Sequence, residues 1–185
     1  MIPQFYKQFQ HWGAQGTVWI YSDPHFGDAE LKAGIRKRPS DEELLQMINS
    51  KVGRKDTFIC LGDVGDIEFA KRIKGYKILI CGNHDVGHSV YEDIFDEVYS
   101  GPVIVGEKII LSHEPLPGIE WALNIHGHDH SPFTKTDKYH FNVCADVIGY
   151  TPVHLNSLLK SGILSKIPSV HRITIDKATE RKKKK

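Results

Sequence analysis

The stretch Lys77-Ile78-Leu79-Ile80-Cys81-Gly82-Asn83-His84-Asp85 decides how this chain folds. Residues 78–81 form an apolar run that is typical of a buried strand, and the run stops at Gly82. Three polar side chains follow at once: the amide of Asn83, the imidazole of His84 and the carboxylate of Asp85. In α/β proteins the loops at the carboxyl ends of buried strands usually carry the chemistry, because the strand is a rigid mount. We therefore expect a functional site just after this strand.

Four other segments repeat this pattern of an apolar run followed at once by polar residues. The polar blocks are Asp23-Pro24-His25, Gly62-Asp63, Ser112-His113 and Gly127-His128-Asp129-His130. The strands predicted before them cover 17–21, 56–61, 108–111 and 123–126. A single Asp-x-His or Gly-Asp pair is commonly an ordinary turn. Five such blocks, each at the end of a predicted strand, indicate one shared site.

The first half of the chain alternates strands with helices, and strands dominate the second half. A capping box, Ser40-Asp41-Glu42-Glu43, begins a helix that we predict to end before Gly53. Residues 103–105 and 108–111 are predicted to pair as a hairpin. The other predicted elements are helices at 29–38, 66–74, 89–95 and 155–161, and strands at 138–143 and 170–175. This order predicts an α/β fold of two packed sheets with helices on their outer faces.

The composition is that of an ordinary globular protein. Hydrophobic residues make up 40% and charged residues 25% of the 185 residues, which suits a single domain over residues 1–176. No apolar run approaches the roughly 20 residues that span a bilayer, and the N-terminus has no signal-peptide pattern. Three cysteines without a CxxC spacing indicate reduced thiols. We therefore expect a cytoplasmic protein without a membrane partner.

The formal net charge is +1, but the positive charge is concentrated at the C-terminus. Residues 181–185 supply five of the 24 basic residues, which leaves 19 against 23 acidic ones, or −4. We interpret residues 177–185 as a basic, disordered tail, with a nucleic-acid-binding arm as the alternative. The mildly acidic body argues against a nucleic-acid partner, because such partners are recognised by clustered cations.

The five strand ends together offer seven candidate metal ligands of mixed oxygen and nitrogen type. They are Asp23, His25, Asp63, Asn83, His113, His128 and His130. This set suits manganese, iron or zinc better than calcium or magnesium, which favour oxygen ligands alone. Seven ligands are too many for one four-coordinate ion. They suit two ions that share a bridging carboxylate and keep open positions for water and substrate.

Two metal ions roughly 3.5–4 Å apart are a common device for phosphoester hydrolysis. They bind the phosphoryl oxygens and activate a bridging hydroxide, which attacks phosphorus in line. The leaving oxygen then needs a proton from a group that lies near the metals without binding them. His84, next to Asn83, is the candidate catalytic acid, and we expect Asp85 to orient it or stabilise its charge.

Taken in order from Asp23 to His130, the five blocks resemble the calcineurin-like metallophosphoesterase superfamily, and in particular its small, single-domain bacterial and phage members. The resemblance implies an αββα sandwich of two packed mixed sheets flanked by helices. It implies one metal held by Asp23, His25, Asp63 and His130. It implies a second metal held by the bridging Asp63 with Asn83, His113 and His128. His84 would be the acid, Asn142 and Asp146 would support the site from behind, and His126 would be structural.

The expected activity is metal-dependent hydrolysis of a small phosphodiester or a nucleotide-like substrate. Two divalent ions are expected, manganese first, with iron, zinc or nickel as alternatives. A phosphomonoesterase, a phosphoprotein phosphatase and a nuclease remain alternatives, because a fold does not specify a substrate. Outside catalysis, the alternatives are a metal-binding scaffold that has lost activity and a single structural zinc site.

Overall fold

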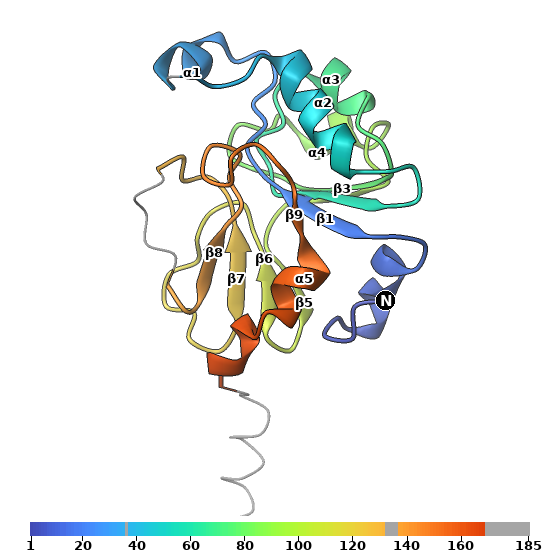
Figure 1. Ribbon diagram of the computed structural model, residues 1–185, viewed down its shortest axis with the longest axis vertical. Coiled ribbons are helices and arrows are strands. Elements are labelled where there is room, and N and C mark those ends of the chain that lie inside the picture. Colours follow the sequence, from blue (N-terminus) through green and yellow to red (C-terminus); the bar gives the residue numbers. More distant parts are fainter. Residues whose placement is uncertain (36, 132–136, 169–185) are drawn as a thin grey trace, which may run out of the picture.

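The computed structural model describes residues 1–35, 37–131 and 137–168, and two β-sheets form its centre (Figure 1). The first sheet has the strand order β4-β3-β2-β1-β9. Its strands are β1 (Val18–Tyr21), β2 (Thr57–Cys60), β3 (Tyr76–Ile80), β4 (Glu97–Tyr99) and β9 (Val153–His154). β1 to β4 run parallel, and β9 is antiparallel to β1. The carboxyl ends of β1, β2 and β3 therefore meet at one edge.

The second sheet has the strand order β5-β6-β7-β8. Its strands are β5 (Val103–Gly106), β6 (Ile109–Leu111), β7 (Leu123–His126) and β8 (His140–Asn142). β5 and β6 form the predicted antiparallel hairpin, whereas β6, β7 and β8 run parallel. Both sheets are thus mixed, and the predicted α/β class with two packed mixed sheets and flanking helices is confirmed.

Short helices connect the strands. They are α1 (Ala29–Gly34), α2 (Asp41–Lys51), α3 (Ile67–Lys71), α4 (His88–Tyr91), α5 (Leu155–Lys160) and the 3₁₀ turns η1 (Lys7–Gly13) and η2 (Ile163–Lys166). α2, α3 and α4 lie over the outer face of the β3-containing sheet (Figure 1). The predicted capping box begins α2: the Ser40 hydroxyl accepts from the Glu43 N–H, and the Glu43 carboxylate accepts from the Ser40 N–H. None of the described helices is long and apolar enough to cross a membrane.

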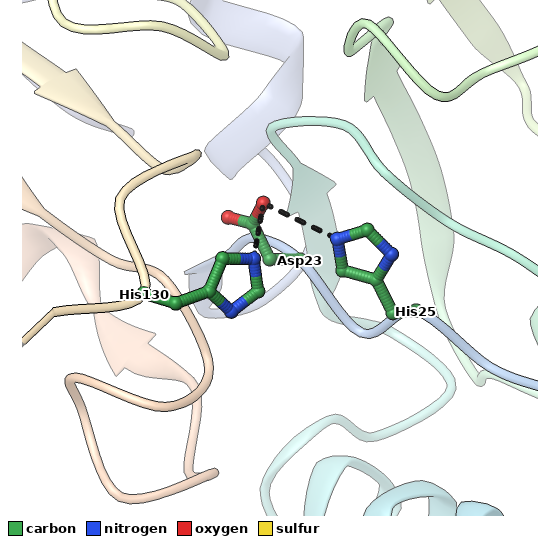
Figure 2. A group of neighbouring side chains, drawn as sticks. All are labelled: Asp23, His25 and His130. Carbon is green, nitrogen blue, oxygen red and sulfur yellow. Dashed lines mark ion pairs between the residues drawn. The ribbon is translucent and has the colours of Figure 1, made fainter. Parts of the chain in front are cut away.

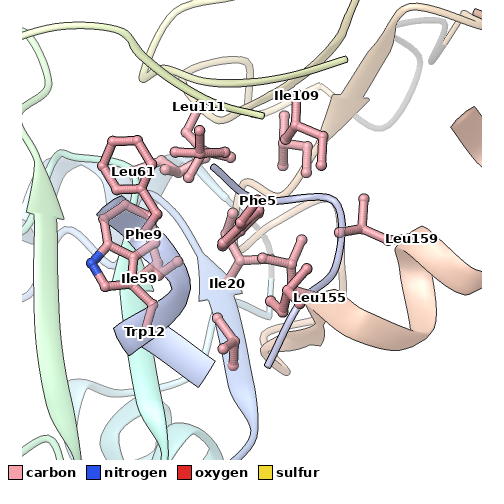
Figure 3. Packing of buried hydrophobic residues seen from close by; sticks show 14 of the residues in the cluster. Phe5, Phe9, Trp12, Ile20, Ile59, Leu61, Ile109, Leu111, Leu155 and Leu159 are labelled. Carbon is pink, nitrogen blue, oxygen red and sulfur yellow. The ribbon is translucent and has the colours of Figure 1, made fainter. Parts of the chain in front are cut away.

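Successive side chains of each central strand point to opposite faces of the sheet and so contribute to two separate hydrophobic cores. On β2, Phe58 and Cys60 face α2 to α4, whereas Ile59 points between the two sheets. The core between the sheets also contains Phe9 and Trp12 of η1 (Figure 3). The N-terminal lead-in, whose aromatic residues have no period in the sequence, is therefore part of the hydrophobic core. The strands that carry the polar loops are buried on both faces, which makes them rigid.

A half-buried carboxylate attaches the lead-in to the sheet. Glu97 of β4 accepts hydrogen bonds from His11 Nε2 (2.7 Å), Trp12 Nε1 (2.8 Å), the Tyr76 hydroxyl (3.0 Å) and the Tyr99 hydroxyl (2.5 Å). Burial raises the pKa of Glu97, but these hydrogen bonds outweigh burial and hold that pKa below its usual range. Glu97 thus joins η1 to the edge strands through side chains alone.

The structure differs from the sequence prediction at several boundaries. α1 ends at Gly34 rather than at residue 38, because the chain leaves the helix and brings the Arg38 side chain to the carbonyls of Asp23 and Pro24. α3 ends at Lys71 rather than at residue 74. β4 and β9 were not predicted, since both are short and only half-buried. The predicted strand at 170–175, His171 and the basic tail at 177–185 lie outside the described residues.

Candidate metal centre

The loops after β1, β2, β3, β6 and β7 converge at one end of the sandwich. Backbone hydrogen bonds join them: the Asp23 N–H donates to the Gly62 carbonyl (3.1 Å), and the Gly127 N–H donates to the His113 carbonyl (2.9 Å). The His25 N–H donates to the Asp63 carbonyl (3.0 Å). The backbone alone therefore holds the loop after β1 to the loop after β2, and the loop after β6 to the loop after β7.

Asp23, His25 and His130 form the first group of candidate ligands (Figure 2). Asp23 Oδ1 lies 3.9 Å from His25 Nε2 and 3.7 Å from His130 Nε2. This oxygen is buried and has no hydrogen-bond partner in the described part of the chain. A buried carboxylate oxygen that faces two imidazole nitrogens without a hydrogen bond fits a divalent cation, which would satisfy all three atoms.

Asp63, His113 and His128 form the second group, and Asn83 lies among them. His113 Nε2 is 2.8 Å from Asn83 Oδ1 and 3.1 Å from His128 Nδ1, and Asn83 Oδ1 is 3.0 Å from His128 Nδ1. The other ring nitrogen, His113 Nδ1, lies 2.8 Å from the Leu61 carbonyl. That carbonyl fixes Nδ1 as the donor and leaves Nε2 free to bind a cation.

Asp63 lies between the two groups. Its Oδ2 is 3.3 Å from His25 Nε2 and 3.3 Å from His113 Nε2, while its Oδ1 accepts the His84 N–H at 3.0 Å. Burial raises the pKa of Asp63, but the hydrogen bonds with His113, His25 and the His84 backbone hold it far below its usual range. An ionised carboxylate with one oxygen facing both groups is placed to bridge two cations.

The backbone is strained at the same positions. Among the described residues other than glycine, six have a positive φ, and four of them are candidate ligands: Asp23 (59°), His25 (43°), Asp63 (53°) and His128 (66°). Such conformations cost about 1–3 kcal/mol each and persist where the surrounding structure holds them. Their concentration in the ligand loops is typical of a functional site.

Two motif glycines allow the loops to approach so closely. A Cβ atom at Gly82 would overlap Asp63 Oδ1, and one at Gly127 would overlap Ser22 Oγ and Asp23 Oδ2. Any other residue at either position would displace a carboxylate of the centre. The glycines of these blocks thus serve the packing of the ligands.

His84 lies beside the two groups and belongs to neither. Its ring is exposed and stands 5.5 Å from the His25 ring, measured between centroids. Its backbone N–H holds Asp63 Oδ1. The imidazole therefore reaches the open side of the centre while its own backbone helps to orient the central carboxylate.

Asp85 has a different position from the one expected. Its carboxylate accepts hydrogen bonds from the backbone N–H groups of Gly82 (2.7 Å), Asp63 (2.9 Å) and Val64 (2.9 Å). Among the described residues, the Asp85 carboxylate makes no hydrogen bond or ion pair with the His84 ring. Because both oxygens bind backbone donors of two loops, Asp85 clamps the loop after β2 to the loop after β3.

Asp85→Asn tests this clamp. The amide would direct N–H donors at backbone N–H groups, so we expect a loss of about 2 kcal/mol in the free energy of unfolding. We also expect weaker metal binding, because Asp63 moves with its backbone. Urea unfolding of metal-free protein measures the first effect, with the exposed Asp93→Asn as the matched control. A fall in turnover at unchanged stability would instead return Asp85 to a role in orienting His84.

Three residues behind the first group support it. Asp146 Oδ2 accepts from His130 Nδ1 at 2.6 Å, and Asn142 Nδ2 donates to the Asp129 carbonyl at 2.7 Å. These contacts fit the supporting position that the resemblance implied for both residues. Arg38, which binds the same Asp146 oxygen, was not predicted, since a lone arginine before a proline carries no motif. For His130, burial lowers the pKa, but the hydrogen bond with Asp146 and the negative charges of Asp23 and Asp146 together outweigh burial and raise the pKa.

His126 has a structural environment, as expected. It is 3% exposed, and its Nδ1 lies 2.8 Å from the Gly127 carbonyl. Burial lowers the pKa of His126, which favours the neutral form of the ring. It belongs to none of the described ligand groups.

A cavity of about 260 Å³ opens beside the second group. Asn83 and His113 form part of its wall, and Ser100, Pro102 and Glu114 form others. The described residues that line it include Glu114 but no lysine or arginine. The cavity therefore offers space next to the centre without a positive charge.

Comparison with known proteins supports the fold. No family model matches this chain. An uncharacterized protein of Methanocaldococcus jannaschii is 28% identical over 167 residues, which cover 77% of this chain and 89% of that protein. The solved structure of a protein of unknown function from Aquifex aeolicus aligns with a TM-score of 0.65 at 25% identity, over 78% of this chain and 98% of that one. The nuclease MPE of Pseudomonas putida aligns with a TM-score of 0.46 at 23% identity, over 61% of each chain.

Proposed function

We propose that this chain is a metal-dependent phosphoesterase that acts through a dinuclear centre. The observation that carries the proposal is Asp63 Oδ2, which lies 3.3 Å from a histidine nitrogen of each ligand group. Two neighbouring groups that share a carboxylate describe two cation sites a few ångströms apart, which is the arrangement of two-metal phosphoester hydrolysis. A single structural zinc ion would leave one of the two ligand groups without a bound cation.

The first site consists of Asp23, His25, His130 and Asp63, and the second of Asp63, Asn83, His113 and His128. Mixed oxygen and nitrogen donors without a thiolate favour manganese, with iron, zinc or nickel as alternatives. When bound, such ions supply the positive charge that holds the phosphoryl oxygens and lowers the pKa of a water molecule.

Residues of the chain position the central carboxylate and supply the proton for the leaving group. Asp63 is held in place by its hydrogen bond from the His84 backbone and by the Asp85 clamp on its N–H. The His84 ring, exposed at the open side, donates a proton to the leaving oxygen of the ester. This ring stands beside the His25 ring and outside both ligand groups.

A phosphodiester is the substrate class that we favour. In a diester both sides of the phosphorus carry an organic group, and the cavity beside Asn83 and His113 gives room for one of them. Glu114 in its wall disfavours a second phosphate, because like charges repel. An uncharged group such as a nucleoside fits this charge pattern better than a nucleoside diphosphate.

Metal removal followed by two synthetic substrates tests the activity. Protein stripped by a chelator is expected to be inactive, and manganese is expected to restore hydrolysis of bis-p-nitrophenyl phosphate. We expect faster release of nitrophenol from this diester than from p-nitrophenyl phosphate. The measurement is kcat/KM for each substrate at increasing manganese, together with the number of ions bound per chain.

Each result that differs from this expectation favours one of the alternative functions. Faster hydrolysis of the monoester would make this protein a phosphomonoesterase. Two bound ions without hydrolysis of either substrate would favour a metal-binding scaffold. One bound ion per chain would contradict the dinuclear centre.

A further inference from the structure

The guanidinium of Arg38 is buried beneath the first ligand group. Its side chain is 2% exposed, although it comes from the loop between α1 and α2. NH1 donates to Asp146 Oδ2, and NH2 donates to the carbonyls of Asp23 (3.0 Å) and Pro24 (2.7 Å). One planar side chain thus binds three acceptors from two segments that are far apart in the sequence.

Each of these acceptors controls a candidate ligand. Asp146 Oδ2, which Arg38 holds, accepts from His130 Nδ1 at 2.6 Å. This bond directs the opposite nitrogen, His130 Nε2, toward Asp23 Oδ1, 3.7 Å away. The carbonyls of Asp23 and Pro24 belong to the loop in which Asp23 has a φ of 59°. Arg38 therefore acts on the ring of one ligand and on the backbone of another.

The second ligand group is oriented differently. His113 Nδ1 lies 2.8 Å from the Leu61 carbonyl, a neutral backbone acceptor. The hydrogen bonds of Arg38 all end in the Asp23 loop and at Asp146, and none reaches His113, Asn83 or His128 within the described residues. One hydrogen bond links the halves, since Asp23 Oδ2 accepts the His128 backbone N–H at 2.8 Å. Within the described residues, the rings of His113 and His128 are nevertheless oriented by Leu61 and Asn83 and not by Arg38.

We infer that Arg38 is a positioning residue that controls cation affinity in the half of the centre formed by Asp23, His25 and His130, and in that half alone. The inference rests on the proposed metal centre. A guanidinium beside a cation site would repel the cation, but Asp146 lies on its NH1 side and offsets its charge. Lysine could not replace this guanidinium group, because a single ammonium cannot reach Asp146 and both carbonyls in the same planar geometry.

Binding of Mn²⁺ to single-site proteins tests this inference without any activity assay. His113→Ala weakens the second site and leaves the first, whereas His25→Ala does the reverse. In the His113→Ala background, Arg38→Met is expected to raise the Mn²⁺ dissociation constant by roughly 10–100-fold, the usual effect of removing a support behind a metal ligand. In the His25→Ala background, we expect Arg38→Met to leave the dissociation constant unchanged. Isothermal titration calorimetry measures both.

Two further variants keep the test decisive. Arg72→Met removes an exposed arginine paired with Glu42 and is expected to change neither constant. Arg38→Lys retains the buried positive charge but lacks the planar guanidinium, so it should also weaken the first site. It replaces Arg38→Met in the test if circular dichroism shows that Arg38→Met does not fold. Equal weakening in both backgrounds, or no weakening in either, would overturn the inference while the dinuclear centre stands. Wild-type protein that binds no Mn²⁺ would overturn the centre itself.

Discussion

Asp63→Asn is expected to remove both metal ions and nearly all phosphoester turnover. Its Oδ2 faces a histidine of each ligand group, and the ionised form is strongly favoured there. An amide has no charge to balance two cations and leaves a weaker donor between them. The loss of several kcal/mol of transition-state stabilisation corresponds to about a 10³-fold or larger fall in kcat/KM.

Metal analysis after dialysis and diester hydrolysis in excess manganese measure this effect. Asp66→Asn is the matched control, because Asp66 is an exposed carboxylate of the same loop that caps α3, and asparagine caps helices equally well. Asp63→Asn protein that keeps two tightly bound ions would contradict the bridging position of Asp63.

His84→Ala is expected to keep both metal ions and to slow turnover by about 10²–10⁴-fold. The ring lies outside the ligand groups, and the hydrogen bond to Asp63 comes from the backbone, which alanine retains. The loss should be greatest for substrates with a poor leaving group, because these need the proton most. Comparison of kcat for a nitrophenyl ester and an alkyl ester of the same phosphate measures the difference.

His154→Ala is the control for this variant, since His154 lies on β9, bonds the Ser157 hydroxyl and belongs to neither ligand group. It should hydrolyse both esters at the wild-type rate. Loss of metal from His84→Ala, or an equal loss for both esters, would show that His84 is not the acid.

The positions of the polar blocks were predictable because they rest on local patterns. An apolar run that stops at a glycine, as at Cys81-Gly82, marks the end of a buried strand wherever it occurs. Parallel strands of one sheet bring their carboxyl ends to one edge, so that the loops carrying Asp23 and Asp63 meet. The α/β class follows from the same alternation of strands and helices.

Other features depend on contacts that no local pattern encodes. Arg38 and Asp146 are 108 residues apart, and their contact exists because α1 ends early and turns the Arg38 side chain inward. Asp85 follows His84 in the sequence, yet its oxygens face the backbone of another loop. Glu97 joins the lead-in to the edge of the sheet through side chains that have no periodic spacing.

The sequence by itself determined which chemical groups stand at the strand ends, because strand burial and glycine turns are local properties. Only the tertiary structure decided how these groups are divided between the two candidate cation sites. Packing of the two sheets places Asp63 Oδ2 between His25 and His113. Hydrogen bonds donated to the Leu61 carbonyl and the Asp146 carboxylate select the histidine nitrogen that faces each site. Such choices depend on atoms brought together across the fold, where a shift of one ångström separates a ligand from a neighbour.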